Sequence, residues 1–378
     1  MIVLRPLIPA CLAVLALLAG CSSAARERDV FEVARFEQDQ VTGVAVSKSG
    51  RVFVSFPRWH DNHRVSVAEV LPDGSFVPWP DAPWNSWREG DPVRPDCFVC
   101  VQSVLVDASD RVWVLDPGSP RMGGVLPGAA KLVQFDLKSG AMRRAYAFTD
   151  VAAPARSYLN DLRLDVARNL AFITDSGLGA LVVLDLKSGA ARRVLSDNPS
   201  TKADPSVILM NAGRELRMAS GPMAGRVPQV HADGIALDQK NGWVYYQALT
   251  SRTLYRVPGA ALADPALTPD SLASKVEHLG PTCATDGMEI DSRGNIYFSD
   301  FENDAVKVRT PDGQMHTLVQ SPLLSWPDSF AIGPAPGGGA RGWLYLTCAQ
   351  IHLTDWFMGP GNMPSTPYRV FRTGLFDR

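Results

Sequence analysis

The sequence has no excess of charge of either sign, because 37 lysine and arginine residues stand against 39 aspartate and glutamate residues in 378 positions. This balance implies neither nucleic acid nor an anionic lipid surface as a partner. No long stretch has the hydrophobic period of an amphipathic helix. A nucleophile elbow, a P-loop and a glycine-rich dinucleotide motif beside a predicted helix are also missing. The chemistry that these motifs serve is therefore not indicated.

Long apolar runs are scarce as well. The run from Leu7 to Gly20 has about 14 residues, which is too short for a helix that crosses a bilayer of roughly 30 Å. Its position after Arg5 is typical of a signal peptide, which we assign to residues 1–20. The four residues that end in Cys21 resemble a bacterial lipobox, and the alternative is an ordinary signal peptide with an incidental cysteine.

Lipidation of Cys21 would make residues 21–30 a lipidated tether, since each buried CH₂ of an acyl chain contributes about 0.8 kcal/mol to membrane binding. Ser22 stands where many inner-membrane lipoproteins have aspartate. The sequence thus predicts an exported protein, anchored by lipid to the outer membrane and facing the periplasm. We expect no other membrane contact, and a monomer.

Cysteine is rare beyond this segment, where only Cys97, Cys100, Cys283 and Cys348 occur. The CxxC spacing of Cys97 and Cys100 is found in redox dithiols and in half of a zinc site, but a second CxxC and a neighbouring histidine are absent. An oxidising compartment favours a structural disulfide instead. Four cysteines allow three connectivities, and Cys283 with Cys348 is one reasonable pair.

Residues 31–378 repeat one pattern, in which a polar opening and an alternating strand are followed by a turn and a strand rich in aromatic and β-branched residues. The six copies open at Thr42, Gln102, Asn160, Asp233, Asp286 and Asp328. This repetition predicts an all-β domain with the fold of a six-bladed β-propeller. Residues 30–36 precede the first copy and should complete the last blade, which removes two free sheet edges. Residues 196–230 fit no strand pattern and predict a long loop over one face.

In a propeller, the start of the innermost strand and the end of the second strand lie at the same mouth of the central channel. The candidate ligand-binding side chains at this mouth are Trp59, Asn160, Asp161, His231, Asp233, Asp286, Phe301 and Asp328. Converging carboxylates need a cation, shared protons or hydrogen-bond donors. Carboxylate and amide oxygens suit Ca²⁺ or Mg²⁺ better than zinc. The alternative is that each Asp-Gly pair merely caps a turn.

Several motifs in this order resemble the major royal jelly protein and yellow family over residues 30–374. They are Val112-Trp-Val-Leu-Asp, Ile173-Thr-Asp-Ser-Gly, Asp233-Gly-Ile-Ala-Leu, Thr285-Asp-Gly-Met and Trp326-Pro-Asp-Ser. Bacterial members are described as related to L-dopachrome tautomerase, and some insect relatives bind biogenic amines in the channel. The resemblance implies a small-molecule site, and an isomerase if the protein is an enzyme.

A more distant resemblance is to the gluconolactonase and regucalcin group, which holds one divalent cation in the channel and hydrolyses lactones. That resemblance implies Asn160, Asp233 and Asp286 as metal ligands, with Asp233 in place of an asparagine. Thr42 and Gly43 stand where the group has a first-blade glutamate, so one ligand is missing.

Three functions follow as hypotheses. In a channel enzyme, Asp233 and Asp286 would act as general base or metal ligands while Asn160 orients the substrate. In a binding protein without turnover, the acidic mouth with Phe56, Trp59 and Phe301 would hold an amine or aromatic metabolite. The third possibility is a scaffold for other envelope proteins.

Overall fold

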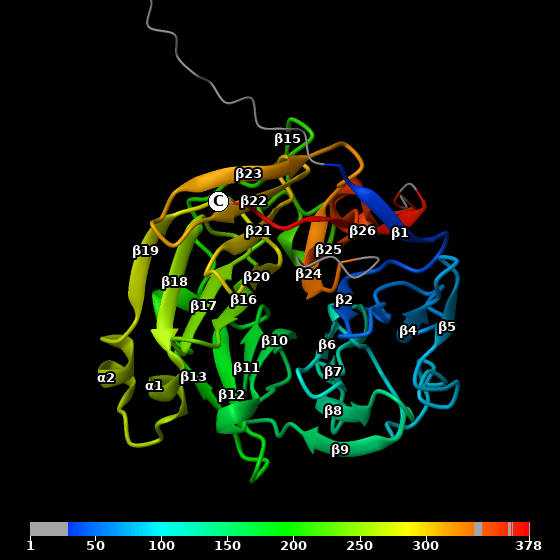
Figure 1. Cartoon of the computed structure of the whole chain (residues 1–378), viewed down its shortest axis with the longest axis horizontal. Helices are drawn as coiled ribbons and strands as arrows, with labels where there is room; N and C mark the ends of the chain where they lie inside the picture. The colour runs from blue at the N-terminus through cyan, green and yellow to red at the C-terminus, as the bar shows by residue number, and fades with distance from the viewer. Residues whose placement is uncertain (1–28, 336–341, 362–363, 365, 378) are drawn as a thin grey trace, which may run out of the picture.

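Short runs of β-branched and aromatic residues, separated by turns rich in glycine and aspartate, form six four-stranded antiparallel sheets around a central channel (Figure 1). The computed structural model describes residues 29–335, 342–361, 364 and 366–377. The predicted signal peptide and the lipidation site Cys21 lie outside these residues. The sheets confirm the predicted six-bladed propeller.

Each of blades 1 to 5 is built from four strands that follow one another in the chain, from the channel outward. The strands of blades 1 and 2 are β2 (Gly43–Val46), β3 (Val52–Ser55), β4 (Val67–Val70), β5 (Phe76–Pro78), β6 (Ser103–Val106), β7 (Arg111–Asp116), β8 (Lys131–Asp136) and β9 (Met142–Ala147). Those of blades 3 and 4 are β10 (Leu159–Asp165), β11 (Leu170–Asp175), β12 (Ala180–Asp185), β13 (Ala191–Val194), β16 (Ala232–Asp238), β17 (Trp243–Ala248), β18 (Thr253–Pro258) and β19 (Glu277–Pro281). Blade 5 has β20 (Met288–Ile290), β21 (Ile296–Asp300), β22 (Ala305–Arg309) and β23 (Met315–Gln320).

Blade 6 joins the two ends of the domain. Its strands are β24 (Pro327–Gly333), β25 (Trp343–Cys348), β26 (Tyr368–Gly374) and, on the outside, β1 (Phe31–Phe36). β1 pairs antiparallel with β26, and Phe36 lies opposite Tyr368 in the register. The prediction that residues 30–36 complete the last blade is therefore confirmed.

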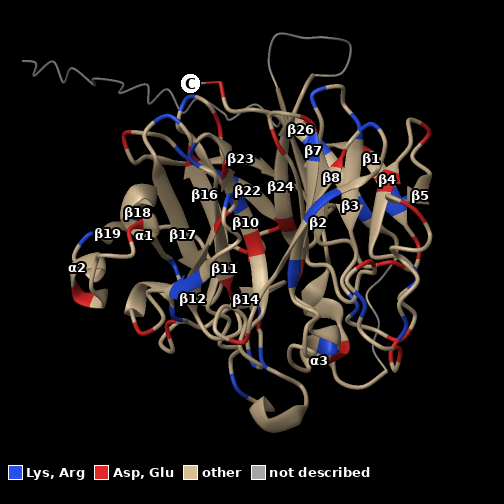
Figure 2. Ribbon diagram, turned by 90° about the horizontal axis from the view of Figure 1, so that it is seen from below, with Lys and Arg blue, Asp and Glu red and all other residues tan. Residues whose placement is uncertain are grey.

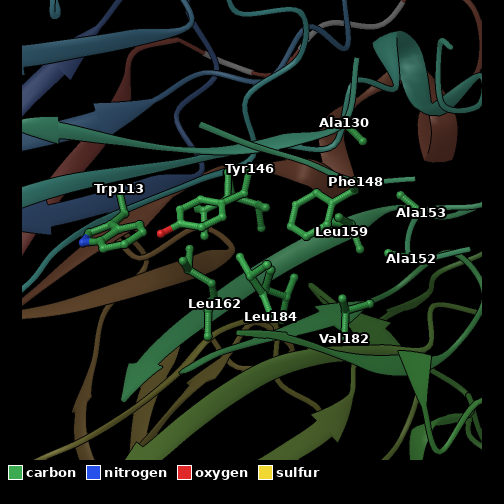
Figure 3. Close-up of a cluster of buried hydrophobic side chains, with 14 of the residues drawn as sticks. Trp113, Ala130, Tyr146, Phe148, Ala152, Ala153, Leu159, Leu162, Val182 and Leu184 are labelled. Carbon is green, nitrogen blue, oxygen red and sulfur yellow. The ribbon is translucent and has the colours of Figure 1, made fainter. Parts of the chain in front are cut away.

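The hydrophobic core lies between neighbouring blades rather than at the channel. In the cluster between blades 2 and 3, Trp113 and Tyr146 stack at 6.3 Å between ring centroids, and Leu162 and Leu184 pack beside them (Figure 3). The Tyr146 hydroxyl donates a hydrogen bond to the carbonyl oxygen of Leu186 at 2.9 Å, so the buried phenol is satisfied. Such packing fixes each blade against the next, and the strand starts at the channel inherit that rigidity.

Hydroxyl groups also join the blades at the channel. Ser55 of blade 1 donates to the carbonyl oxygen of Gln102 in blade 2 at 2.9 Å. Thr174 of blade 3 donates to that of Asp233 in blade 4 at 2.7 Å, and Thr347 of blade 6 to that of Thr42 in blade 1 at 2.6 Å. In each case the first strand of one blade is positioned by the second strand of its neighbour.

The segment between β13 and β16 crosses one face of the disc, as the lack of a strand pattern in residues 196–230 predicted. It contains the small hairpin of β14 (Met210–Asn211) and β15 (Arg214–Glu215). The helix α3 (Asp355–Met358) lies on the same face (Figure 2). Two further short helices, α1 (Gly259–Ala263) and α2 (Pro269–Ala273), connect β18 with β19. None of the described helices is long and apolar enough to cross a membrane.

The expected structural disulfide is not formed, because Cys97, Cys100, Cys283 and Cys348 are all free and buried. Cys283 packs in the hydrophobic cluster between blades 4 and 5, whereas Cys348 packs in the cluster between blades 5 and 6. Although Cys283 and Cys348 lie at the same mouth on neighbouring blades, their thiols are in different clusters, because each side chain turns into a different interblade core.

Candidate functional site at the channel mouth

The openings of the repeats in blades 2 to 6 each place a polar side chain at a cavity of about 470 Å³ at one mouth of the channel. These side chains are Gln102, Asn160, Asp233, Asp286 and Asp328. Blade 1 contributes Trp59, which follows β3. Thr42, which opens the first repeat, is buried and donates its hydroxyl to the carbonyl oxygen of Gln102 instead. The structure thus brings together five of the predicted side chains, and their roles in ligand binding remain predictions. The five are Trp59, Asn160, Asp233, Asp286 and Asp328.

Irregularities in the strand pairing place three of these side chains. The register shifts at the first residues of β10, β16 and β24, and the shifts lie between Leu159 and Leu162, between Ala232 and Ile235, and between Pro327 and Phe330. A β-bulge re-aims the side chains around it. The shifts contain Asn160, Asp233 and Asp328, which accounts for their common direction toward the cavity.

The glycines after two of the aspartates serve close packing between blades. A Cβ atom on Gly234 would lie 2.7 Å from the carbonyl oxygen of Asp286, and one on Gly287 would lie 2.2 Å from that of Asp328. Both distances are shorter than any side chain tolerates. The Asp-Gly pairs therefore do not cap turns, since the glycine admits the next blade and the aspartate faces the channel.

Asp233 and Asp286 form a hydrogen-bonded carboxyl pair. Asn160 donates its side-chain N–H to Oδ1 of Asp233 at 2.5 Å, and the Trp326 indole N–H donates to Oδ2 of Asp286 at 2.7 Å. All four residues are buried. Because two adjacent buried carboxylates repel, a shared proton is the arrangement that this geometry favours.

The three aspartates differ in how strongly they hold a proton. Burial, reinforced by the charges of Asp286 and Asp328, raises the pKa of Asp233 well above its ordinary value. Burial also raises the pKa of Asp286, but only to about 6, because the hydrogen bonds from Trp326 and Asp233 stabilise its ionised form. Burial and the charge of Asp286 raise the pKa of Asp328. At neutral pH Asp233 is the acid of the pair and Asp286 the base.

Trp326 is held in an unusual conformation. Its φ angle is +55°, in the left-handed region that bulky residues rarely adopt. Its ring stacks on Phe301 with centroids 4.2 Å apart, and on the other side on His352 at 5.8 Å. Backbone strain of this kind persists only where surrounding contacts enforce it. Phe301 therefore packs against Trp326 and does not line the cavity, although the sequence predicted it as a ligand-binding residue.

A second hydrogen-bonded chain lies on the side of blades 1 to 3. The Trp59 indole N–H donates to the Tyr158 hydroxyl at 2.8 Å, and that hydroxyl donates to Oε1 of Gln102 at 2.8 Å. The thiol of Cys100 also lies beside the Tyr158 hydroxyl, and burial raises the pKa of Cys100 to about 12, so the thiol is neutral.

The walls and roof of the cavity are largely apolar. Trp356 and Phe357 of α3 line it together with Met218, from the loop between β13 and β16. The backbone N–H of Ala219 donates to the carbonyl oxygen of Trp356 at 2.6 Å, which joins the two roof segments. Trp356 also lies against Trp59, with ring centroids 5.2 Å apart. Flat apolar surface thus surrounds a polar floor.

Two predicted residues lie elsewhere. Asp161 lines a separate cavity of about 570 Å³, with Arg163, and forms an ion pair with it at 2.9 Å. It faces away from Asn160 because successive residues of a strand point to opposite sides. His231 accepts a hydrogen bond at Nδ1 from the backbone N–H of Ala203 at 2.9 Å and holds the roof loop in place. Neither side chain lines the cavity of Asp233 and Asp286.

The residues expected to hold a divalent cation do not fit one in this arrangement. Asn160 turns its N–H to Asp233, and Asp286 accepts from Trp326 and hydrogen-bonds Asp233. Among the described residues no group of three or more His, Cys, Asp or Glu side chains has a metal-binding arrangement. The side chains that would bind a cation at this mouth are already hydrogen-bonded to other groups of the protein.

Sequence reasoning missed several residues of the site. Trp326 stood in a motif that was used only for the family resemblance, and Tyr158 lay just before the third repeat opening. Trp356 and Met218 lie in segments without any periodic pattern. An aromatic residue two positions before a repeat opening is the signal that would have pointed to Tyr158 and to Trp326.

Solved structures with the same architecture are similar over nearly the whole chain. A gluconolactonase from Xanthomonas campestris has a TM-score of 0.55 at 15% identity, covering 94% of this chain and 93% of that one. A luciferin-regenerating enzyme has a TM-score of 0.52 at 12% identity, covering 92% and 96%. At such identities the likeness shows the fold alone.

Sequence relatives match over shorter stretches. Protein yellow of Drosophila melanogaster is 27% identical over 127 residues, which is 32% of this chain and 23% of that protein. Major royal jelly protein 5 of Apis mellifera is 26% identical over 223 residues, 55% of this chain and 34% of that protein. Dopaminechrome tautomerase of Drosophila melanogaster is 27% identical over 165 residues, 40% and 34%. The matches span about a quarter to a third of these relatives.

The family model for Major royal jelly protein matches residues 99–329, which is more than half of the chain. The matched region includes Gln102, Asn160, Asp233, Asp286 and Asp328. The chain belongs to the major royal jelly protein family.

Proposed function

We propose that this protein binds a small cyclic or aromatic molecule at the channel mouth and moves a proton on it, as a tautomerase. The observation that carries the proposal is the buried Asp233 and Asp286 pair, in which Asn160 donates a hydrogen bond to Asp233 and the Trp326 indole donates one to Asp286. Burial raises the pKa of Asp233 well above its ordinary value and that of Asp286 only to about 6. Two carboxyl groups with separated pKa values are the arrangement that acid–base catalysis requires.

The shape of the cavity supports a flat ligand. Its volume of about 470 Å³ lies within the range of small-molecule sites. The rings of Trp59, Tyr158 and Trp356 line it, and burial of ligand surface against such rings is strongly favourable. The polar floor then orients the ligand over the carboxyl pair.

The proposed step balances without any added reactant. The Asp286 carboxylate removes a proton from a ring carbon of the ligand, and Asp233 returns its own proton to the conjugated system at another atom. The ligand changes only the position of one hydrogen. Proton transfer from Asp286 to Asp233 within their hydrogen bond then restores the starting pair. Asn160, which donates to Asp233, holds that acid in place throughout.

One relative supports this reaction class by its name, since dopaminechrome tautomerase matches 40% of this chain. Lactone hydrolysis has less support, because Thr42 replaces the expected glutamate and the other donors do not fit a cation.

Turnover of dopaminechrome, followed by the change in its visible absorbance, tests the proposal. We expect Asp286→Asn and Asp233→Asn each to lower kcat by at least about 100-fold, the usual contribution of general acid–base catalysis. Asp136→Asn, at the last residue of β8 and outside the cavity lining, is the matched control and should keep wild-type turnover. Equal rates in all four proteins would reject the pair as the catalytic group.

A binding protein without turnover is the second candidate. Three carboxyl groups line the cavity, whereas Arg156 is the only basic side chain among the described residues that line it. An acidic floor with aromatic walls suits a ligand cation. On this alternative, phenethylamine binds with an affinity that Asp286→Asn lowers, because Asp286 is the carboxyl group that is ionised at neutral pH, and no protein, wild type or variant, converts dopaminechrome.

We also propose that the protein is exported and lipidated on Cys21, on the outer membrane facing the periplasm. The support is the sequence pattern of residues 1–22. Radiolabelled palmitate should enter the wild-type protein in cells and should not enter Cys21→Ser. Labelling of both proteins, or of neither, would contradict the proposal.

A further inference from the structure

We propose that Gln102 presents its amide N–H to the cavity as a fixed hydrogen-bond donor for a carbonyl oxygen of the ligand. The ligand class, a conjugated ring that bears such an oxygen, rests on the proposed function. In this role Gln102 contacts the ligand, while Tyr158 and Trp59 are positioning residues.

The direction of the hydrogen bonds fixes the orientation of the Gln102 amide. The Trp59 indole nitrogen can only donate, so the Tyr158 hydroxyl must be its acceptor. The hydroxyl proton of Tyr158 then points to Gln102, whose carbonyl oxygen accepts it at 2.8 Å. The opposite orientation would set the amide N–H against the Tyr158 proton. The amide nitrogen therefore faces away from Tyr158.

The backbone of Gln102 is equally fixed. Its carbonyl oxygen accepts hydrogen bonds from Thr42 Oγ1 at 3.2 Å and from Ser55 Oγ at 2.9 Å. Its N–H donates to the carbonyl oxygen of Leu115 at 3.0 Å. The side chain lines the cavity, and within the described part of the chain its amide nitrogen donates to no protein group. An amide donor that faces a cavity and has no protein partner is available to a ligand or water acceptor.

Gln102 lies across the channel from Asp286, the proposed base. Gln102 belongs to blade 2 and Asp286 to blade 5, which stand opposite each other in a ring of six. A ligand that spans the cavity can hold an oxygen at Gln102 while Asp286 removes a proton at its other end. Negative charge that moves through the conjugated ring onto that oxygen is stabilised by a donor already in place.

Two matched probes test the donor without any turnover. Isatin and indole are flat rings of similar size, and only isatin carries carbonyl oxygens. We expect the wild-type protein to bind isatin more tightly than indole in titration calorimetry. Gln102→Glu keeps the acceptor for Tyr158 but puts an oxygen in place of the amide nitrogen. It should weaken isatin binding by about tenfold or more and change indole binding by less than about twofold.

Tyr158→Phe tests the positioning chain. The variant leaves Gln102 free to rotate, so isatin binding should weaken several-fold while indole binding is kept. Gln239→Glu is the control, since Gln239 donates to the carbonyl oxygen of Leu164 in the separate cavity. It should keep the wild-type ratio of the two affinities. Thermal melting of each variant verifies that it is folded.

The outcomes separate this inference from the proposed function. A wild-type protein that does not prefer isatin, or that binds neither probe, overturns the donor role of Gln102. So does Gln102→Glu if it weakens both probes equally or leaves isatin binding unchanged. Failure of the wild type to convert dopaminechrome rejects the tautomerase alone, because the ratio of probe affinities does not depend on turnover.

Discussion

At the scale of single residues, donor-only side chains set the chemistry of the mouth. An indole N–H cannot accept a hydrogen bond, so Trp326 and Trp59 impose a direction on every group that follows them. Trp326 imposes it on Asp286 and Trp59 on Tyr158. The hydrogen bond from the neutral Trp326 indole stabilises the ionised form of Asp286 more than its protonated form.

Trp326→Phe removes that donor and should move the pH dependence of turnover. The indole N–H lowers the pKa of Asp286 from the higher value that burial alone would give, so its loss raises the pKa above about 6. Because Asp286 acts as a base only when ionised, the acid limb of kcat/KM should shift to higher pH by about one unit. Trp113→Phe is the control, since Trp113 donates to Asp107 at 2.9 Å, away from the cavity. An unshifted limb in Trp326→Phe would contradict the role of this hydrogen bond.

The four described cysteines allow a second prediction for single residues. Burial raises the pKa of the thiols of Cys100, Cys283 and Cys348, so they stay protonated and unreactive in the folded protein. Dithiothreitol should shift the melting temperature by less than about 1 °C, whereas loss of a structural disulfide costs about 2–4 kcal/mol. A clear fall in melting temperature on reduction would restore the disulfide that the sequence suggested.

At the scale of elements, β1 closes the ring. Phe36 is almost fully buried, and its ring lies 5.0 Å from that of Phe56 and 5.2 Å from that of Phe76. A chain that begins at residue 38 would lose these contacts and expose the edge of β26, which is a template for aggregation. We expect this chain to be insoluble or to melt far below a control that begins at residue 29. Equal melting of the two chains would show that the last blade does not need its fourth strand.

The sequence predicted the elements well where they repeat and poorly where they do not. The six strand pairs follow from one repeated pattern of short strands and turns, and the closing strand follows because residues 30–36 have no blade of their own. The roof of the cavity has no such constraint, since Met218 reaches it from a loop and Trp356 from the single-turn helix α3, neither of which belongs to a repeat. Strand starts also could not reveal the bulges that separate Asn160 from Asp161, and a one-residue shift decides which of two neighbours faces the mouth.

At the scale of the whole molecule, the protein keeps three carboxyl groups in the channel at a cost to its stability. A carboxyl group whose pKa is raised by folding binds more protons in the folded state than in the unfolded state. Its contribution to stability is therefore fully present below the unfolded pKa of about 4 and is lost as the pH rises through the folded pKa. The shift of Asp286 to about 6 corresponds to a loss of about 2–3 kcal/mol.

Asp328→Asn isolates this effect, because Asp328 has a raised pKa and is not one of the proposed catalytic pair. Burial lowers the pKa of His63 to about 3 and of His352 to about 4, so these histidines add stability as the pH rises and oppose the aspartates. The difference between variant and wild type removes their contribution. Asp328→Asn should match the wild type near pH 4 and exceed it by about 1–2 kcal/mol at pH 7 in urea unfolding.

Asp136→Asn is the control of opposite sign, since the hydrogen bond from Arg143 lowers the pKa of Asp136. Stability that depends on the charge of Asp136 is present above the unfolded pKa, so this variant should lose stability relative to the wild type as the pH rises from 2 to 7. If Asp328→Asn instead lost stability toward neutral pH, its carboxylate would have a favourable partner in the folded channel. The cavity would then stabilise the ionised form of Asp328, whereas we infer that burial destabilises it.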